Sequence, residues 1–238
     1  LIKYIDYYKG RFDGSCIETT NEKKTVFNRF LESTYDLGYI FGMFLGNGTH
    51  HLIINKKTNS EGGDVSWTLN KNRHDIIEKL YNSILNILNY KCSVVDKDNS
   101  KKIVCYNKCL TKLFLEFGKK TDKHLPEKYY CKNIDYIQGL YDGLIDSNGH
   151  KEKYVNNTIF RFDNTSKSNI ELFYWCCLNL NISFSSSNRG KNEGNLKEVN
   201  KDNLNDCFRI KTHTMNRFTK DYVYSCVKQN AKTRELVE

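Results

Sequence analysis

The chain has 238 residues and a formal net charge of +9, from 37 Lys and Arg against 28 Asp and Glu. A chain of this length can bury a substantial core, as one large domain or two small ones. No stretch is apolar for long enough to cross a membrane and the first residues do not resemble a signal peptide, so the composition argues against a membrane or secreted protein. The basic excess favours a polyanionic partner, although an ordinary solvated basic surface would have the same composition.

The nine cysteines do not form a pattern that predicts a metal site or a disulfide framework. Cys176 and Cys177 are adjacent, Cys105 and Cys109 are four positions apart, and there is no CxxC pair. We therefore expect reduced, mostly buried thiols in an intracellular protein. The single proline and the abundance of Lys, Asn, Ile and Tyr suggest an AT-rich genome, which would place the protein in a bacterium, a phage-infected cell or an organelle.

The first half of the chain predicts the order helix, two strands, helix, two strands, helix. The expected elements are a helix at 37–48, strands at 49–57 and 64–70, a helix at 73–89, strands at 92–97 and 101–106, and a helix at 108–117. In the second strand Val65, Trp67 and Leu69 alternate with polar residues, so one face of the sheet should be buried and the other open.

A polar connector at 119–133 is expected to separate the halves, and the second half repeats the order of the first. Its expected elements are a helix at 138–149, strands at 151–155 and 158–165, a helix at 169–179, and strands at 182–187 and 207–213. The predicted fold class is α+β, with duplicated αββαββα repeats and two antiparallel sheets that are each covered by helices on one face.

Two segments spaced by small residues repeat at an offset of 101 residues. The offset carries Gly38, Gly42, Gly46, Asn47 and Gly48 onto Gly139, Gly143, Ser147, Asn148 and Gly149. A helix places small residues four positions apart on one face, which lets two helix backbones approach closely. The sequence therefore predicts that the two helices pack side by side and that their polar ends meet.

The segment YDGLIDSNG at 141–149 resembles the motif of the LAGLIDADG homing endonucleases, and residues 40–48 are a looser copy of it. The resemblance implies a first repeat at 34–124, a linker at 125–132 and a second repeat at 133–213, with extensions at 1–33 and 214–238. It also implies a DNA-binding saddle formed by the two sheets, with the motif helices at the interface between the repeats. Because both motif helices are in one chain, the expected state is a monomer.

In the family, an acidic residue just before the last glycine of each motif binds a divalent metal ion, usually Mg²⁺. Here both positions are asparagine, Asn47 and Asn148, so the resemblance assigns them as the metal and catalytic positions with weakened metal binding. The backbone carbonyls of Gly46 and Ser147 are expected to complete the metal shell. Asp146 has Leu45 as its counterpart and is therefore expected to be structural.

The family also places basic residues beside the metals, and the candidates here are Lys71, Lys108 and Lys211. His50, His51 and His150 follow the motif glycines and are expected to lie in loops. The outward faces of the sheets, with the loop at 188–205, are expected to contact the DNA major groove. The predicted DNA-binding residues are Ser66, Thr68, Asn70, Arg161, Asp163, Arg189, Arg209, Lys211 and His213.

These features together predict a site-specific homing endonuclease that makes a staggered double-strand break in a long DNA target. Asparagine at both metal positions predicts that this chain binds DNA without cutting it, and deliberate Asp-to-Asn replacement is the simplest account of two equivalent changes. The alternative is a non-catalytic DNA- or RNA-binding descendant, such as a maturase or a regulator. The sequence leaves three origins open. The chain could come from within an intein with flanking splicing domains, from an intron, or from a free-standing gene.

Overall fold

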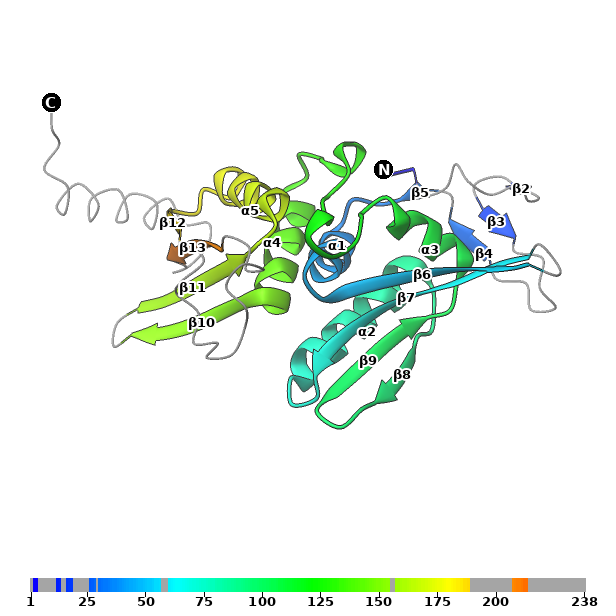
Figure 1. Ribbon diagram of the computed structural model, residues 1–238. Coiled ribbons are helices and arrows are strands. Elements are labelled where there is room, and N and C mark those ends of the chain that lie inside the picture. The colour runs from blue at the N-terminus through cyan, green and yellow to red at the C-terminus, as the bar shows by residue number, and fades with distance from the viewer. Residues whose placement is uncertain are drawn as a thin grey trace, which may run out of the picture. The chain divides into compact units, whose positions relative to one another are not determined.

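The computed structural model describes residues 2–3, 12–13, 16–18, 26–28, 30–56, 60–154, 157–188 and 207–213. By its contacts the chain divides into two compact units, residues 1–147 and 148–238. Each unit contains a four-stranded antiparallel sheet, and helices and strands alternate along the chain as the repeats predicted (Figure 1). The predicted α+β fold class is therefore confirmed. The predicted repeat boundaries describe a duplication in sequence, which contacts do not test, and they stay a prediction.

The first unit is built around a sheet with the strand order β6-β7-β9-β8. Its elements are α1 (Tyr35–Asn47), β6 (Gly48–Asn55), β7 (Ser60–Asn70), α2 (His74–Leu88), β8 (Ser93–Asp96), β9 (Ser100–Cys105), α3 (Lys108–Leu115) and α4 (Ile134–Asn148), the last residue of which falls in the second unit. Two short 3-10 helices, η1 (Lys120–Asp122) and η2 (Glu127–Tyr129), lie in the predicted connector.

Short strands also occur before the first repeat. They are β1 (Ile2–Lys3), which pairs with β5 (Phe30–Leu31), and the antiparallel group β2 (Phe12–Asp13), β3 (Cys16–Glu18) and β4 (Val26–Asn28).

Local sequence explains where the helices of the first unit begin and which faces they bury. Thr34 caps α1, because its hydroxyl accepts a hydrogen bond from the backbone N–H of Leu37 at 3.5 Å. Asn107 caps α3 in the same way, through the N–H of Leu110 at 3.0 Å. In α2 the apolar residues recur at helical spacing and the stripe they form, including Leu80, is buried.

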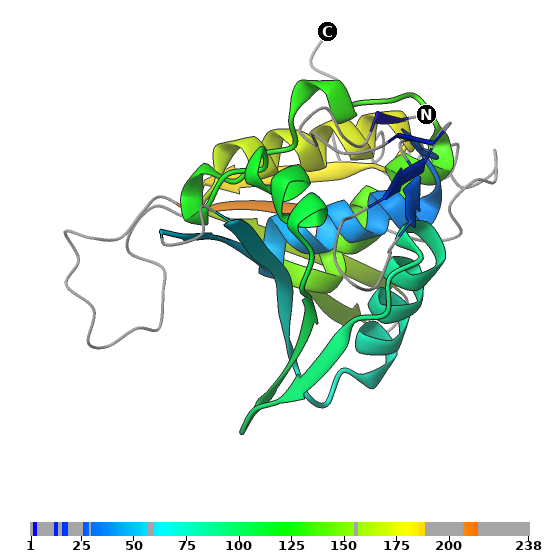
Figure 2. The same ribbon diagram turned by 90° about the vertical axis from the view of Figure 1, so that its right-hand side faces the viewer.

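The core of the first unit lies between the sheet and the helices. Trp67 is fully buried on the inward face of β7, with Val65 and Leu69 on the same face, as the alternation predicted. It meets Phe114 of α3 edge-on, and Phe114 lies 4.2 Å, centroid to centroid, from Phe44 of α1. Figures 1 and 2 show the helices on one side of this sheet, which leaves the opposite side uncovered by them.

The second unit has the strand order β10-β11-β13-β12, and among its described residues one helix packs against the sheet. Its elements are β10 (Gly149–Tyr154), β11 (Asn157–Asn164), α5 (Lys167–Asn179), β12 (Phe184–Asn188) and β13 (Phe208–His213). Ser166 caps α5 through the N–H of Asn169 at 3.4 Å. Phe162 of β11 is fully buried and stacks on Phe173 of α5 at 4.6 Å.

The expectation that His50, His51 and His150 lie in loops is wrong, because β6 and β10 begin directly at the motif glycines and include all three. The expectation of free, mostly buried thiols is confirmed for the described cysteines, of which Cys92, Cys105, Cys109, Cys176 and Cys177 are buried. Within the described ranges, no helix is both long and apolar enough to cross a bilayer.

Candidate catalytic centre and nucleic-acid interface

The motif helices α1 and α4 pack against each other through glycine faces. A Cβ atom on Gly42 would overlap the carbonyl oxygen of Leu140 in α4, and one on Gly143 would overlap the carbonyl oxygen of Tyr39 in α1. The glycines that make this close contact are Gly38, Gly42, Gly139 and Gly143. Because only a hydrogen atom fits at these positions, the seam between the helices depends on glycine, as the sequence spacing predicted.

The predicted catalytic positions are the last residues of the two helices. Asn47 ends α1, and its side-chain Nδ2 donates a hydrogen bond to the backbone carbonyl of Ser147 in α4 at 3.0 Å. The Ser147 hydroxyl donates back to the carbonyl of Leu144 at 3.0 Å. Asn148 ends α4 and is exposed. Asn47 therefore ties the end of its own helix to the end of the other motif helix.

The residues at the end of α1 do not fit a divalent metal ion as they stand. Mg²⁺ prefers anionic oxygen ligands, whereas Asn47 is neutral and uses its N–H group toward Ser147. The carbonyl of Gly46, the other predicted ligand in this helix, lies 3.4 Å from the Nζ atom of Lys123. Across the described ranges, no cluster of three or more His, Cys, Asp or Glu side chains could hold a metal ion.

Lys123 is a basic residue that the structure places at the end of α1. Its side chain is buried, at 7% exposure, and its Nζ donates to the carbonyls of Phe44 at 3.1 Å and Gly48 at 2.6 Å, in addition to Gly46. The Phe44 carbonyl also accepts the backbone N–H of Gly48, whereas the Gly46 carbonyl lies in the last turn, where carbonyls lack partners within the helix. The ammonium group at this end offsets the negative end of the helix dipole. Burial lowers the pKa of Lys123 to about 8.

His50 joins the end of α1 to the same connecting segment. It is buried in β6 and stacks on Phe44, and its Nε2 lies 3.2 Å from the carbonyl oxygen of Gly118. Burial lowers the pKa of His50, which favours the neutral ring. The segment from Gly118 to Lys123 is therefore held to the end of α1 and the start of β6 at two points.

The outward face of the first sheet only partly agrees with the prediction. Thr68 and Asn70 are exposed, as expected of residues that contact DNA. The expectation of exposure is wrong for Ser66, which is fully buried with its hydroxyl oxygen 3.0 Å from that of Thr49 on the neighbouring strand. Ser66 lies in the middle of the sheet, flanked by Thr49 on β6 and Val104 on β9.

The outward face of the second sheet carries the predicted basic residues in cross-strand register. Arg161 lies opposite Lys211, and Asp163 lies opposite Arg209. Arg209 binds Asp163 in a bidentate ion pair, with N–O distances of 2.8 and 3.0 Å, and Arg161 approaches the same carboxylate at 3.4 Å. Asp163 thus holds two arginines on this face, while Lys211 beside them is half-buried.

The side chains of two predicted DNA-binding residues, Arg189 and His213, lie outside the described part of the structure. Arg189 lies outside the described residues, and His213 is placed only as backbone at the end of β13.

Comparison with solved structures finds the same fold in the homing endonuclease I-DmoI. Mesophilic variants of I-DmoI match with a TM-score of 0.50 and 15% identity, covering 85% of this chain and 99% of that chain. I-DmoI in complex with DNA and Mn matches with a TM-score of 0.50 and 16% identity, covering 83% and 96%. The chain has the homing-endonuclease fold. No protein-family model and no curated protein matches it in sequence.

Within this homing-endonuclease fold, the contacts of two of the three lysines predicted to lie beside the metals can be described, and their catalytic role stays a prediction. Lys71 is exposed and donates to the carbonyl of Asp98 at 2.6 Å. Lys108 pairs with Glu61 at 3.0 Å, and two lysines bound to this carboxylate lower the pKa of Glu61 to about 2. Lys123 was missed because nothing in the lysine-rich stretch around it shows which lysine folds inward; Lys211 lies in the second unit.

Proposed function

We propose that this chain binds a long duplex DNA site as a monomer, with one half-site for each repeat, and does not cut that site as it stands. The observation that carries the proposal is the hydrogen bond from Asn47 to Ser147 at the ends of the paired motif helices. The basic outward face of the second sheet and the net charge of +9 support a nucleic-acid partner. An intein or intron origin and the cellular location stay predictions from sequence.

The absence of cutting follows from the chemistry of the helix ends. Hydrolysis of a phosphodiester near neutral pH needs an activated water and a positive charge that stabilises the leaving oxygen, which metal ions supply when carboxylates hold them. A carboxylate at position 47 could not donate to the Ser147 carbonyl, and the two oxygens would repel each other unless a cation lay between them. Restoring Asp at both positions should therefore turn a closed polar contact into a cation site.

The test is to restore both carboxylates and to look for cutting. The chain as it stands would first select its preferred duplex from a random pool, and the N47D/N148D variant would then be incubated with that duplex and Mg²⁺. We expect a staggered double-strand break near the centre of the selected site, and none from the parent chain. N82D/N133D is the matched control, because it makes the same charge change at two exposed positions.

A second candidate is a binding-only descendant of a homing endonuclease, such as a maturase or regulator. It is favoured by the same Asn47 contact, because the amide fits its present partner without a metal. Tight DNA or RNA binding by a restored variant that still fails to cut would support this candidate. If no duplex is selected at any salt concentration, DNA binding is wrong for both candidate functions.

A further inference from the structure

The glycine faces of α1 and α4 do not by themselves fix how far one helix lies along the other. Gly38 and Gly42 are four residues apart, and so are Gly139 and Gly143. If α4 moved by four residues along α1, one glycine of each helix would still face the opposite backbone. Such a shift corresponds to about 6 Å along the helix axis. It would separate Asn47 from Ser147, whose contact spans 3.0 Å.

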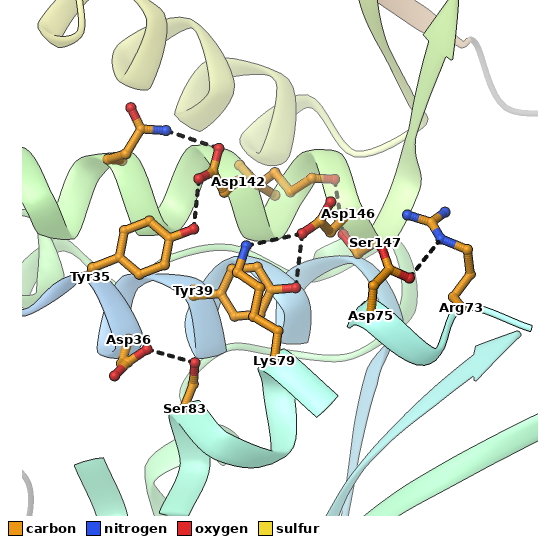
Figure 3. Close-up of polar contacts among 12 residues, drawn as sticks. Tyr35, Asp36, Tyr39, Arg73, Asp75, Lys79, Ser83, Asp142, Asp146 and Ser147 are labelled. Atoms are coloured by element: carbon orange, nitrogen blue, oxygen red, sulfur yellow. Dashed lines mark hydrogen bonds and ion pairs between the residues drawn. The ribbon is translucent and has the colours of Figure 1, made fainter. Parts of the chain in front are cut away.

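Two tyrosine–aspartate hydrogen bonds cross the seam and can distinguish these registers. The hydroxyl of Tyr35 donates to Asp142 at 2.7 Å, and the hydroxyl of Tyr39 donates to Asp146 at 2.9 Å (Figure 3). Both pairs join residues 107 positions apart, so they are equivalent contacts one helical turn from each other. We call them the two rungs.

A third helix supports the rung nearer the helix ends. The Nζ atom of Lys79 in α2 lies 3.4 Å from Asp146 and 3.9 Å from the centre of the Tyr39 ring (Figure 3). Burial and the charge of Asp146 raise the pKa of Tyr39 well above its ordinary value. The Tyr39 hydroxyl therefore keeps its proton and remains a donor.

The rungs occur on one side of the seam only. The offset of 101 residues carries Phe41 and Leu45 of α1 onto Asp142 and Asp146 of α4. On that side the ring of Phe41 meets the ring of Tyr136 edge-on at 6.3 Å. The rungs are thus not a product of the duplication, and they distinguish the native register from a one-turn shift. In that shift one tyrosine would face the wrong aspartate, and the remaining tyrosine and aspartate would both lose their hydrogen bond across the seam.

We propose that Tyr35, Tyr39, Asp142 and Asp146 are positioning residues that fix the register of the two motif helices. By fixing the register they also set the separation of the catalytic positions at the helix ends. This second role rests on the proposed function. A single rung is not sufficient, because Tyr35 alone could pair with either Asp142 or Asp146.

The first experiment needs no nuclease activity. The chain as it stands is labelled with ¹⁵N, and the side-chain amide signals of Asn47 are assigned by their loss in N47D. We expect Y39F, Y35F and the double variant Y35F/Y39F to show a second set of Asn47 amide signals from the shifted register. Y81F/Y106F, which removes two hydroxyls elsewhere, should keep a single set. A single unshifted set in Y35F and in Y39F would overturn the proposal even if the double variant does not fold.

The second experiment measures the separation of the catalytic positions in the N47D/N148D background. The two strand breaks are mapped to the nucleotide on the selected duplex. We expect Y35F/Y39F to cut at least tenfold more slowly and to lose the fixed offset between the two breaks. The D142N/D146N variant keeps acceptor oxygens for both tyrosines and should keep the offset.

A variant that only destabilises the fold is compared with Y35F/Y39F in the same break-mapping experiment. L80A, in the buried face of α2, should lower the active fraction and leave the offset unchanged. An unchanged offset in Y35F/Y39F would contradict the positioning role. If N47D/N148D does not cut at all, the prediction that restored carboxylates give a nuclease fails, and the Asn47 amide signals of the parent chain still decide the register.

Discussion

Lys123 shows how one residue can connect the fold to the proposed site. Its ammonium group is buried at the end of α1 and contacts three backbone carbonyls there. A lysine stem is flexible and its ammonium is a compact charge, so it can reach several carbonyls that a planar guanidinium would not match. Burial of the charge costs free energy, which the lowered pKa of about 8 expresses.

The lowered pKa of Lys123 predicts how stability depends on pH. Between pH 8 and 10.5 the unfolded chain keeps the Lys123 proton while the folded chain has lost it. Raising the pH across this window therefore favours the folded state, by up to about 3 kcal/mol from this group. Urea unfolding of the parent and of K123M, at several pH values from 7 to 10.5, should show that their difference in free energy of unfolding grows with pH. Parallel pH curves for the two proteins would contradict the assignment.

At the scale of elements, the sequence predicts most of the fold because each element carries its own signal. Alternation identified β7, helical spacing identified α2, and the glycine offset identified α1 and α4 as a pair. Contacts that depend on several elements at once could not be predicted. Alternation assigned Ser66 to the outward face, but its hydroxyl meets Thr49 of the neighbouring strand and the residue is buried. The partner of Asn47 likewise comes from another element, the second motif helix.

The seam between α1 and α4 predicts a strong effect of a single added methyl group. The variants G42A and G143A would each place a Cβ atom into the backbone of the opposite helix, so the helices must separate. We expect each to lower the free energy of unfolding by about 2–3 kcal/mol, typical of overpacking. G62A is the matched control, because a Cβ atom there meets nothing within 4 Å. Equal effects of the G62A and G143A changes in denaturant titrations would show that the seam is not closely packed.

At the scale of the whole molecule, the charge distribution predicts salt-dependent binding to DNA. The chain carries a net charge of +9, and Arg161, Arg209 and Lys211 share one sheet face. Each phosphate that a protein contacts adds about 0.9 to the slope of log affinity against log salt concentration. Arg161 and Arg209 both pair with Asp163, whereas Lys211 has no ion pair among the described residues, so its charge is the least compensated of the three there.

This arrangement gives a prediction for K211A. We expect it to weaken binding to every duplex by a similar factor and to reduce the slope of the salt dependence by about 1. Fluorescence anisotropy at salt concentrations from 50 to 300 mM would measure both quantities, with K132A, an exposed lysine of the connector, as the control. A loss confined to one duplex sequence would instead indicate that Lys211 reads a base.

The packing of α4 within the first unit has a consequence for synthesis on the ribosome. The contacts of that unit extend to residue 147, and the buried ring of Tyr136 meets Phe41 in its core. A nascent chain that has emerged only to residue 133 lacks α4, so the glycine face of α1 stays open to water and chaperones. The first unit can complete its folding only after the second motif helix has left the exit tunnel. Translation pauses before that point would lengthen the exposure of this face.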